Sequence, residues 1–133
     1  MVHTREAEED TLQVLQEAIT HPTDVCIHFH CFTSSAPFAE KLLQLYPKAF
    51  IGFTGVCTFS STQSVRDVVS ITPLDRFLLE TDAPYMAPSP YRGYVAHSGM
   101  VPFVAKTIAE VKGVSLSDVF QHARQNTKVM YGI

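Results

Sequence analysis

Cysteine, net charge and long apolar runs are all scarce in this sequence of 133 residues, and each scarcity excludes a class of protein. Only three cysteines occur, at positions 26, 31 and 57, and an odd number at irregular spacing does not make a disulfide framework. No apolar stretch approaches the ~20 residues that a membrane-spanning helix needs. The first ten residues are acidic and have no apolar core, so we expect no secretory signal there. We therefore expect reduced thiols and a cytoplasmic or nuclear location.

The charge balance is slight, since 10 Lys and Arg residues against 13 Asp and Glu residues give a formal net charge of -3. This balance provides no overall electrostatic reason to bind nucleic acid, so any phosphate contact has to be local. The composition is that of a globular protein, 46% hydrophobic and 17% charged, and no linker or low-complexity segment divides it. We therefore treat residues 1–133 as one domain.

Short apolar segments alternate with segments of helical periodicity along the whole chain. Clusters of β-branched and aromatic residues predict buried strands at residues 25–30, 49–54 and 77–81. Apolar residues at helical spacing predict helices at residues 11–19, about 35–45, 62–70, 100–112 and 116–131. This alternation is typical of βα units around a parallel sheet, so we expect the α/β fold class.

Four residues with chemically useful side chains lie at or near the ends of expected strands: His3, His30, Thr54 and Asp82. The separations between them are 27, 24 and 28 residues, each close to one βα unit. Strand C-termini converge on one face both in a (β/α)8 barrel and in a doubly wound sheet. We therefore expect His3, His30 and Asp82 to meet, although the spacing alone does not choose between the two folds.

Two imidazoles and a carboxylate suit a divalent metal ion such as Mg²⁺, Mn²⁺ or Zn²⁺, and they leave coordination positions open for water and substrate. Such an ion lowers the pKa of its bound water and polarises an ester or phosphoryl oxygen. Asp82 can also accept the proton of the attacking water. The structural alternative is that His3 caps a helix, His30 is a hydrogen-bonded core residue and Asp82 starts a turn before Pro84. Residue types alone weigh these two interpretations equally.

Four short segments occur in a distinctive order: His3-Thr-Arg-Glu-Ala, His30-Cys-Phe-Thr-Ser, Glu80-Thr-Asp-Ala-Pro-Tyr and Pro90-Tyr-Arg-Gly. In order and spacing they resemble the TatD family of metal-dependent deoxyribonucleases, and the tail Gln125-Asn-Thr-Lys-Val-Met-Tyr resembles that family's C-terminal helix. The resemblance covers essentially the whole chain. It implies a (β/α)8 TIM barrel of the metal-dependent hydrolase type that hydrolyses DNA phosphodiester bonds. It also implies that His3, His30 and Asp82 are metal ligands, with Asp82 as the general base.

The sequence lacks two parts of the family's pattern: a His-x-His pair at the end of the first strand and a Glu ligand near the middle. Only Met1 and Val2 precede His3, where a strand has ~5–6 residues, and a TIM barrel typically needs ~250 residues. We therefore expect only the second half of the barrel, in a truncated form with an incomplete metal site. The alternative is a catalytically silent barrel remnant that acts as a binding or assembly module.

A half barrel leaves sheet edges unpaired and one face of its strands without an opposing half. We expect that face, formed by Val25, Ile27 and Phe29 or by the alternate residues, to stay partly exposed. The expected consequence is self-association, unless a complementary half-barrel covers the chain.

Two arginines are candidate substrate-binding residues. Arg5 follows His3 closely and can clamp a phosphate, or it can form a salt bridge with a nearby glutamate. Arg92 lies between Tyr91 and Tyr94, where charge and stacking can hold a DNA strand, or where the tyrosines form a simple lid.

Three further residues lie close to the expected ligands. We expect His28 to be packed and hydrogen-bonded rather than a second metal ligand beside His30. Glu80 shares a strand face with Asp82, where it can carry a proton or orient a metal-bound water, but we expect it to pair with a neighbouring arginine. Cys31 is adjacent to His30, so strand alternation directs it to the opposite face and disfavours a Cys–His nucleophile.

Overall fold

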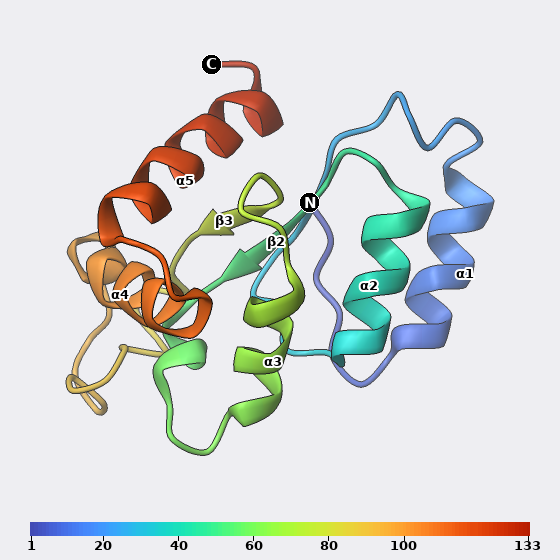
Figure 1. Cartoon of the computed structure of the whole chain (residues 1–133). Helices are drawn as coiled ribbons and strands as arrows, with labels where there is room; N and C mark the ends of the chain where they lie inside the picture. The colour runs from blue at the N-terminus through green and yellow to red at the C-terminus, as the bar shows by residue number, and fades with distance from the viewer.

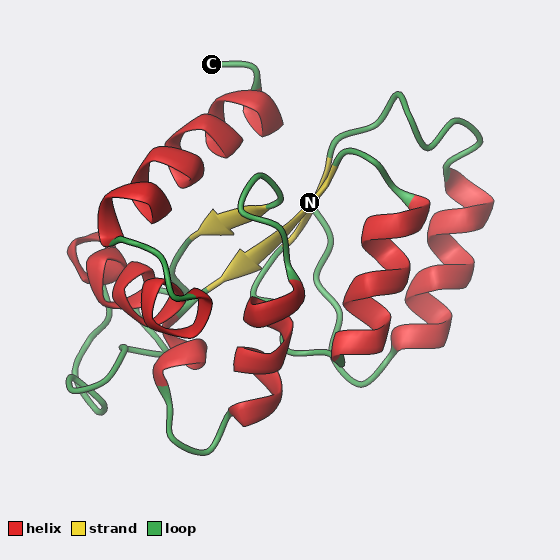
Figure 2. Cartoon of the chain, viewed as in Figure 1, coloured by secondary structure: helices red, strands yellow, loops and turns green.

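The computed structural model describes all 133 residues, as a three-stranded parallel sheet with helices packed around it (Figures 1 and 2). The strands are β1 (Ile27–Phe29), β2 (Ala49–Phe53) and β3 (Phe77–Leu79). The helices are α1 (Glu8–Ala18), α2 (Ala36–Leu45), α3 (Gln63–Ile71), α4 (Val101–Lys112) and α5 (Leu116–Tyr131), with short 3-10 turns η1 (Gly55–Thr58) and η2 (Ser98–Met100). None of the helices combines the length and the apolar character needed to cross a membrane.

The sheet has the strand order β1-β2-β3, and both neighbouring pairs are parallel. On the other edge of β1, Val2 forms a single parallel bridge to Phe29. The Val2 N–H donates to His28 O at 2.7 Å, and His30 N–H donates to Val2 O at 2.8 Å. The predicted α/β class with a parallel sheet is therefore confirmed, and the strand expected before His3 is reduced to this one bridge.

Local sequence signals account for the helix ends. Ser35 caps α2 by accepting a hydrogen bond from Phe38 N–H, and Ser115 and Asp118 form a reciprocal capping box at the start of α5. Gly113 ends α4 in the left-handed conformation with φ 65°, as a C-terminal glycine does. Helix α1 begins at Glu8, three residues before the predicted start, because the acidic residues of its first turn are stabilised by the helix dipole.

The hydrophobic core lies between one face of the sheet and the helices. Every second residue of the strands points into it, and Phe29, Ile51 and Phe77 have no exposed surface. These side chains pack against the apolar faces of the helices, which include Leu42, Val68, Val69, Val104, Ile108 and Val119. Each such burial contributes about 1.5–3 kcal/mol, so the core holds the three strand ends in a fixed relation to one another.

The expectation that one strand face lacks packing partners is wrong. Ile27 and Phe29 are 3% and 0% exposed because the helices cover them. On the opposite face, Phe50 and Leu78 are also buried, at 3% exposure each. Helix α5 lies beside β3 and contributes to this closure (Figure 1). Of the residues named for the exposed face, only Val25, ahead of β1, is substantially exposed, at 39%.

Candidate metal centre

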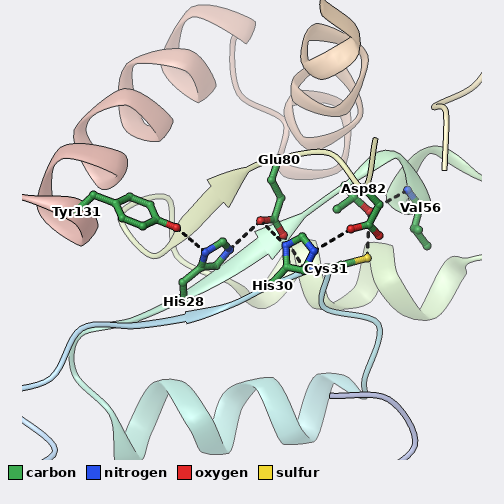
Figure 3. A network of polar contacts seen from close by, with 8 residues as sticks. His28, His30, Cys31, Val56, Glu80, Asp82 and Tyr131 are labelled. Atoms are coloured by element: carbon green, nitrogen blue, oxygen red, sulfur yellow. Dashed lines mark hydrogen bonds and ion pairs between the residues drawn. The ribbon is translucent and has the colours of Figure 1, made fainter. Parts of the chain in front are cut away.

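The candidate site lies where β1 and β3 end, on the sheet face opposite the hydrophobic core (Figure 3). His30 follows β1, while Asp82 follows β3. Nε2 of His30 lies 2.8 Å from Oδ1 of Asp82. The His3 ring lies beside His30, with 6.0 Å between the ring centroids. The structure therefore brings His30 into contact with Asp82 and places His3 next to them.

Glu80 is the centre of a polar network at this site (Figure 3). Its Oε2 accepts a hydrogen bond from Nδ1 of His30 at 2.8 Å and lies 2.8 Å from Nε2 of His28. Its Oε1 accepts from Cys31 N–H at 2.6 Å. The prediction that Glu80 pairs with an arginine is wrong, because two histidines and a backbone amide from the β1 segment already surround its carboxylate.

Gly52 allows the Glu80 carboxylate to cross the sheet. Strand β2 lies between β1 and β3, and Gly52 occupies the crossing point on it. A Cβ atom at Gly52 would lie 2.6 Å from Nε2 of His28 and would overlap the carboxylate of Glu80. Gly52 was not among the predicted site residues. The available signal was a glycine inside an otherwise apolar strand, which is typical of close approach by another group.

His28 is packed and hydrogen-bonded, as predicted. Only 4% of it is exposed, and its Nδ1 lies 2.8 Å from the hydroxyl of Tyr131 at the end of α5. The sequence analysis missed Tyr131, because no local signal connects residues that are 103 positions apart. Donor atoms of His28, His30 and Glu80 nevertheless all lie within 4.8 Å of one another, so this group can also hold a metal ion.

The two carboxylates give the site a negative electrostatic character. Partial burial lowers the pKa of His30, but the adjacent Glu80 and Asp82 outweigh that effect and raise the pKa above its usual value of 6.5. Burial raises the pKa of Glu80, but its contacts with His28, Cys31 N–H and His30 outweigh burial and lower the pKa below its usual value of 4.5. The position between the Glu80 and Asp82 carboxylates therefore favours a positively charged group, such as protonated His30.

The donor set at His30 and Asp82 fits a divalent cation. A carboxylate only accepts hydrogen bonds, so the His30 nitrogen that bonds to Glu80 carries the proton. A neutral His30 then presents a bare Nε2 to Asp82 at 2.8 Å, and two lone pairs at this distance repel unless a proton or a cation lies between them. Neighbouring ligands of one octahedral ion with metal–ligand bonds of ~2.1 Å lie about 3 Å apart, close to the separation of this pair.

Cys31, which donates its N–H to Glu80, has an unusual backbone conformation. Its φ of 45° lies in the left-handed region and turns its N–H toward Glu80. Its Sγ lies 3.4 Å from Oγ1 of Thr54. Burial, together with the nearby Asp82, raises the pKa of this thiol to about 12. The expectation that strand alternation directs Cys31 away from the site is wrong, because the left-handed turn places its Sγ beside Thr54 and Asp82 (Figure 3). A neutral thiol is nevertheless a poor nucleophile, so a Cys–His nucleophile remains disfavoured.

The two candidate arginines make no contact with the residues above. Arg5 is exposed and forms no salt bridge. Arg92 places its guanidinium 3.6 Å from the centroid of the Phe59 ring. It also lines a hollow of about 300 Å³ with Phe59, Pro84, Tyr85, Met86, Ala87, Gly93 and Tyr94. The residues that follow Asp82 in the chain lead into this hollow. Tyr85 N–H donates to Asp82 O at 2.7 Å and closes the turn between them.

Comparison with known proteins identifies the family of this chain. The family model described as TatD related DNase matches residues 1–132. The chain belongs to this family. It is 41% identical over 133 residues to the uncharacterized metal-dependent hydrolase YcfH of Escherichia coli K12, covering 100% of this chain and 49% of that relative. It is 38% identical over 136 residues to the human 3'-5' RNA nuclease TATDN2, covering 100% of this chain and 18% of that relative.

Solved structures of other proteins share the fold. The crystal structure of YJJV, a TatD homolog from Escherichia coli K12, matches with a TM-score of 0.86 and 26% identity, covering 98% of this chain and 49% of that one. An uncharacterized amidohydrolase from Saccharomyces cerevisiae matches with a TM-score of 0.81 and 23% identity, covering 97% and 52%. The chain thus spans about half the length of the bacterial TatD relatives it matches. The predicted TatD membership is confirmed.

Proposed function

We propose that residues 1–133 form the second half of a TatD-type (β/α)8 barrel whose metal centre hydrolyses phosphodiester bonds in DNA. The observation that carries the proposal is the 2.8 Å contact between Nε2 of His30 and Oδ1 of Asp82, with His3 beside it, where parallel strands end. In barrels of this architecture, active sites are built at the carboxyl ends of the strands. Membership of the TatD family and the metal-dependent hydrolase among its relatives support the same function.

In this proposal His3, His30 and Asp82 hold a divalent ion such as Mg²⁺, Mn²⁺ or Zn²⁺. When bound, such an ion polarises a phosphoryl oxygen and lowers the pKa of water. Asp82 is the catalytic residue, since its carboxylate accepts the proton of the attacking water as a general base. Glu80 keeps His30 oriented from the other side of the imidazole ring.

Arg92 and Arg5 are proposed to bind substrate. The Arg92 guanidinium stacks on Phe59 through its face, which leaves its N–H groups available to a phosphate. Tyr85 and Tyr94 in the same hollow are 72% and 71% exposed, as side chains that stack on bases are. Arg5 has no carboxylate partner and lies two positions from His3, so it can supply a second phosphate contact.

RNA is the second candidate substrate, because the human relative at 38% identity is named an RNA nuclease. For the chain's surroundings we propose a complementary half-barrel as partner and a cytoplasmic or nuclear location. All three cysteines are free thiols, which fits a reducing compartment.

The test is a cleavage assay with end-labelled single-stranded DNA, duplex DNA and single-stranded RNA in Mg²⁺, Mn²⁺ or Zn²⁺. The chain is assayed alone and after co-expression with the N-terminal half of a bacterial TatD relative. We expect weak cleavage by the chain alone, stronger cleavage with the complementing half, and loss of cleavage in Asp82→Asn. Binding without cleavage in both preparations would favour the silent binding module instead.

A further inference from the structure

A continuous line of polar side chains connects helix α5 to the candidate ligand His30 (Figure 3). The hydroxyl of Tyr131 lies 2.8 Å from Nδ1 of His28, and Nε2 of His28 lies 2.8 Å from Oε2 of Glu80. The same Oε2 accepts from Nδ1 of His30 at 2.8 Å, and Nε2 of His30 faces Asp82. The line therefore joins α5, β1 and the end of β3 in one network.

The proton of a neutral His30 is placed by the geometry of its two carboxylate contacts. Glu80 only accepts, and Nδ1 of His30 meets its Oε2 in a hydrogen bond, whereas Nε2 of His30 makes an ion-pair contact with Asp82, so Nδ1 is the nitrogen that carries the proton. Nε2 of His28 is buried and lies 2.8 Å from Oε2 of this carboxylate, a charge contact without hydrogen-bond geometry. Nδ1 of His28 shares a hydrogen bond with the Tyr131 hydroxyl at 2.8 Å. A neutral His30 has a bare Nε2, and this nitrogen points toward Asp82.

We propose that Tyr131, His28 and Glu80 are positioning residues that hold His30 as its Nδ1–H tautomer, with the Nε2 lone pair directed at Asp82. Histidines that bind metals commonly donate their other N–H to a carboxylate, which fixes the tautomer and the ring orientation. In this chain the Glu80 carboxylate is itself held by His28 of β1. His28 is in turn held by Tyr131 in the last turn of α5. Helix α5 thereby supports a ligand that it does not touch.

The surroundings restrict the alternatives open to Glu80. Its Oε1 is occupied by Cys31 N–H at 2.6 Å, so the carboxylate cannot rotate without losing that bond. Gly52 lies next to the Glu80 carboxylate, and because glycine has no side chain there is just enough space for the carboxylate and for Nε2 of His28. His28 is 4% exposed, and its Nδ1 is held by the hydroxyl of Tyr131.

The first test reads the tautomer of His30 in the metal-free chain and does not depend on the proposed function. Ring-¹⁵N chemical shifts of His30 are recorded at alkaline pH, where its imidazole is neutral. We expect the Nδ1–H tautomer of His30 in the native chain, a shift toward Nε2–H in Glu80→Ala, and a smaller shift in Tyr131→Phe. Thr127→Val is the matched control, since it removes a hydroxyl from α5 that bonds only to Ala123 O. A native His30 in the Nε2–H form, or one unchanged in Glu80→Ala and Tyr131→Phe, overturns the proposal.

The second test measures Zn²⁺ and Mn²⁺ affinity by calorimetry. Glu80→Gln, which keeps the shape but loses the charge, is expected to weaken binding about 10- to 100-fold, the range for outer partners of a metal ligand. Tyr131→Phe is expected to weaken it less, about 3- to 10-fold, because its hydroxyl acts through two intermediaries. Binding unchanged in both variants overturns the positioning role. A native chain that binds neither ion refutes the proposed metal site, while the tautomer measurement still decides the positioning proposal separately.

Discussion

The close approach at Gly52 predicts that Gly52→Ala destabilises the protein by displacing the Glu80 carboxylate. The new Cβ would overlap the Glu80 carboxylate and lie 2.6 Å from Nε2 of His28, so the carboxylate has to leave its position. It then loses the bonds from Cys31 N–H and from Nδ1 of His30. The backbone itself does not oppose alanine, because Gly52 does not have positive φ.

The magnitude follows from these contacts. A hydrogen bond to a charged group contributes about 1.5–3 kcal/mol, and two of them are lost. Alanine restricts the unfolded chain more than glycine and so returns about 0.4–1 kcal/mol. Allowing for new contacts made by the displaced carboxylate, we expect a decrease of about 2–5 kcal/mol in the free energy of unfolding. For a domain of this size that corresponds to a fall in Tm of about 6–20 °C.

Chemical denaturation and calorimetry measure this effect, and two controls isolate its cause. Gly99→Ala places a Cβ 2.9 Å from Nδ1 of His97, but that imidazole is exposed and can turn away, so little destabilisation is expected. In a Glu80→Ala background the overlapping carboxylate is absent and only the close approach to Nε2 of His28 remains, so Gly52→Ala should destabilise the protein clearly less than in the native background. An equal loss of stability with and without Glu80 would refute the reasoning.

Three further predictions concern reactivity, pH and association. Maleimide at neutral pH should label Cys26 first, because burial raises the pKa of Cys31 and of Cys57 to about 12; three labels at equal rates would contradict this. In metal-free buffer, the raised pKa of His30 stabilises the fold below pH 6.5 and this contribution is lost as the pH rises through the raised value. The lowered pKa of Glu80 stabilises the fold above pH 4.5 and this contribution is lost as the pH falls. The urea concentration at the unfolding midpoint should therefore be highest between pH 4.5 and 6.5. His30→Gln should make this midpoint fall less at alkaline pH, and an unchanged fall would count against stabilisation by the His30–Glu80 pair. Because β3 is an edge strand, sedimentation of the purified chain should show a mass that rises with concentration, and a constant monomer mass would reject this expectation.

Much of the fold could be predicted from the sequence, because its elements depend on local patterns. Helix α3 was expected at residues 62–70 and occurs at 63–71, since its valines recur at helical spacing. Strand β1 proved shorter than residues 25–30, because pairing with β2 sets its length and pairing is not visible in one segment. The contact between His30 and Asp82 was expected for the general reason that parallel strands end on one side of a sheet.

The network around Glu80 could not be predicted in the same way. Its partners depend on the order of the strands and on the empty space above Gly52, which are properties of the assembled sheet. An arginine was expected opposite Glu80 on grounds of charge alone, whereas two histidines of one strand occupy that place. Tyr131 contacts His28 only because α5, at the end of the chain, packs against the sheet.

The long sequence separation of these contacts also sets a time order for folding. His28 and Tyr131 are 103 residues apart, and Glu80 and His30 are 50 apart, so loop-closure entropy opposes early formation of both contacts. On a ribosome adding ~5–20 residues per second, His28 waits about 5–20 s before its tyrosine is synthesised. Helical turns and the βα units form long before that moment. The polar network is therefore a late product of folding, and its formation reports that both ends of the chain have reached their native positions.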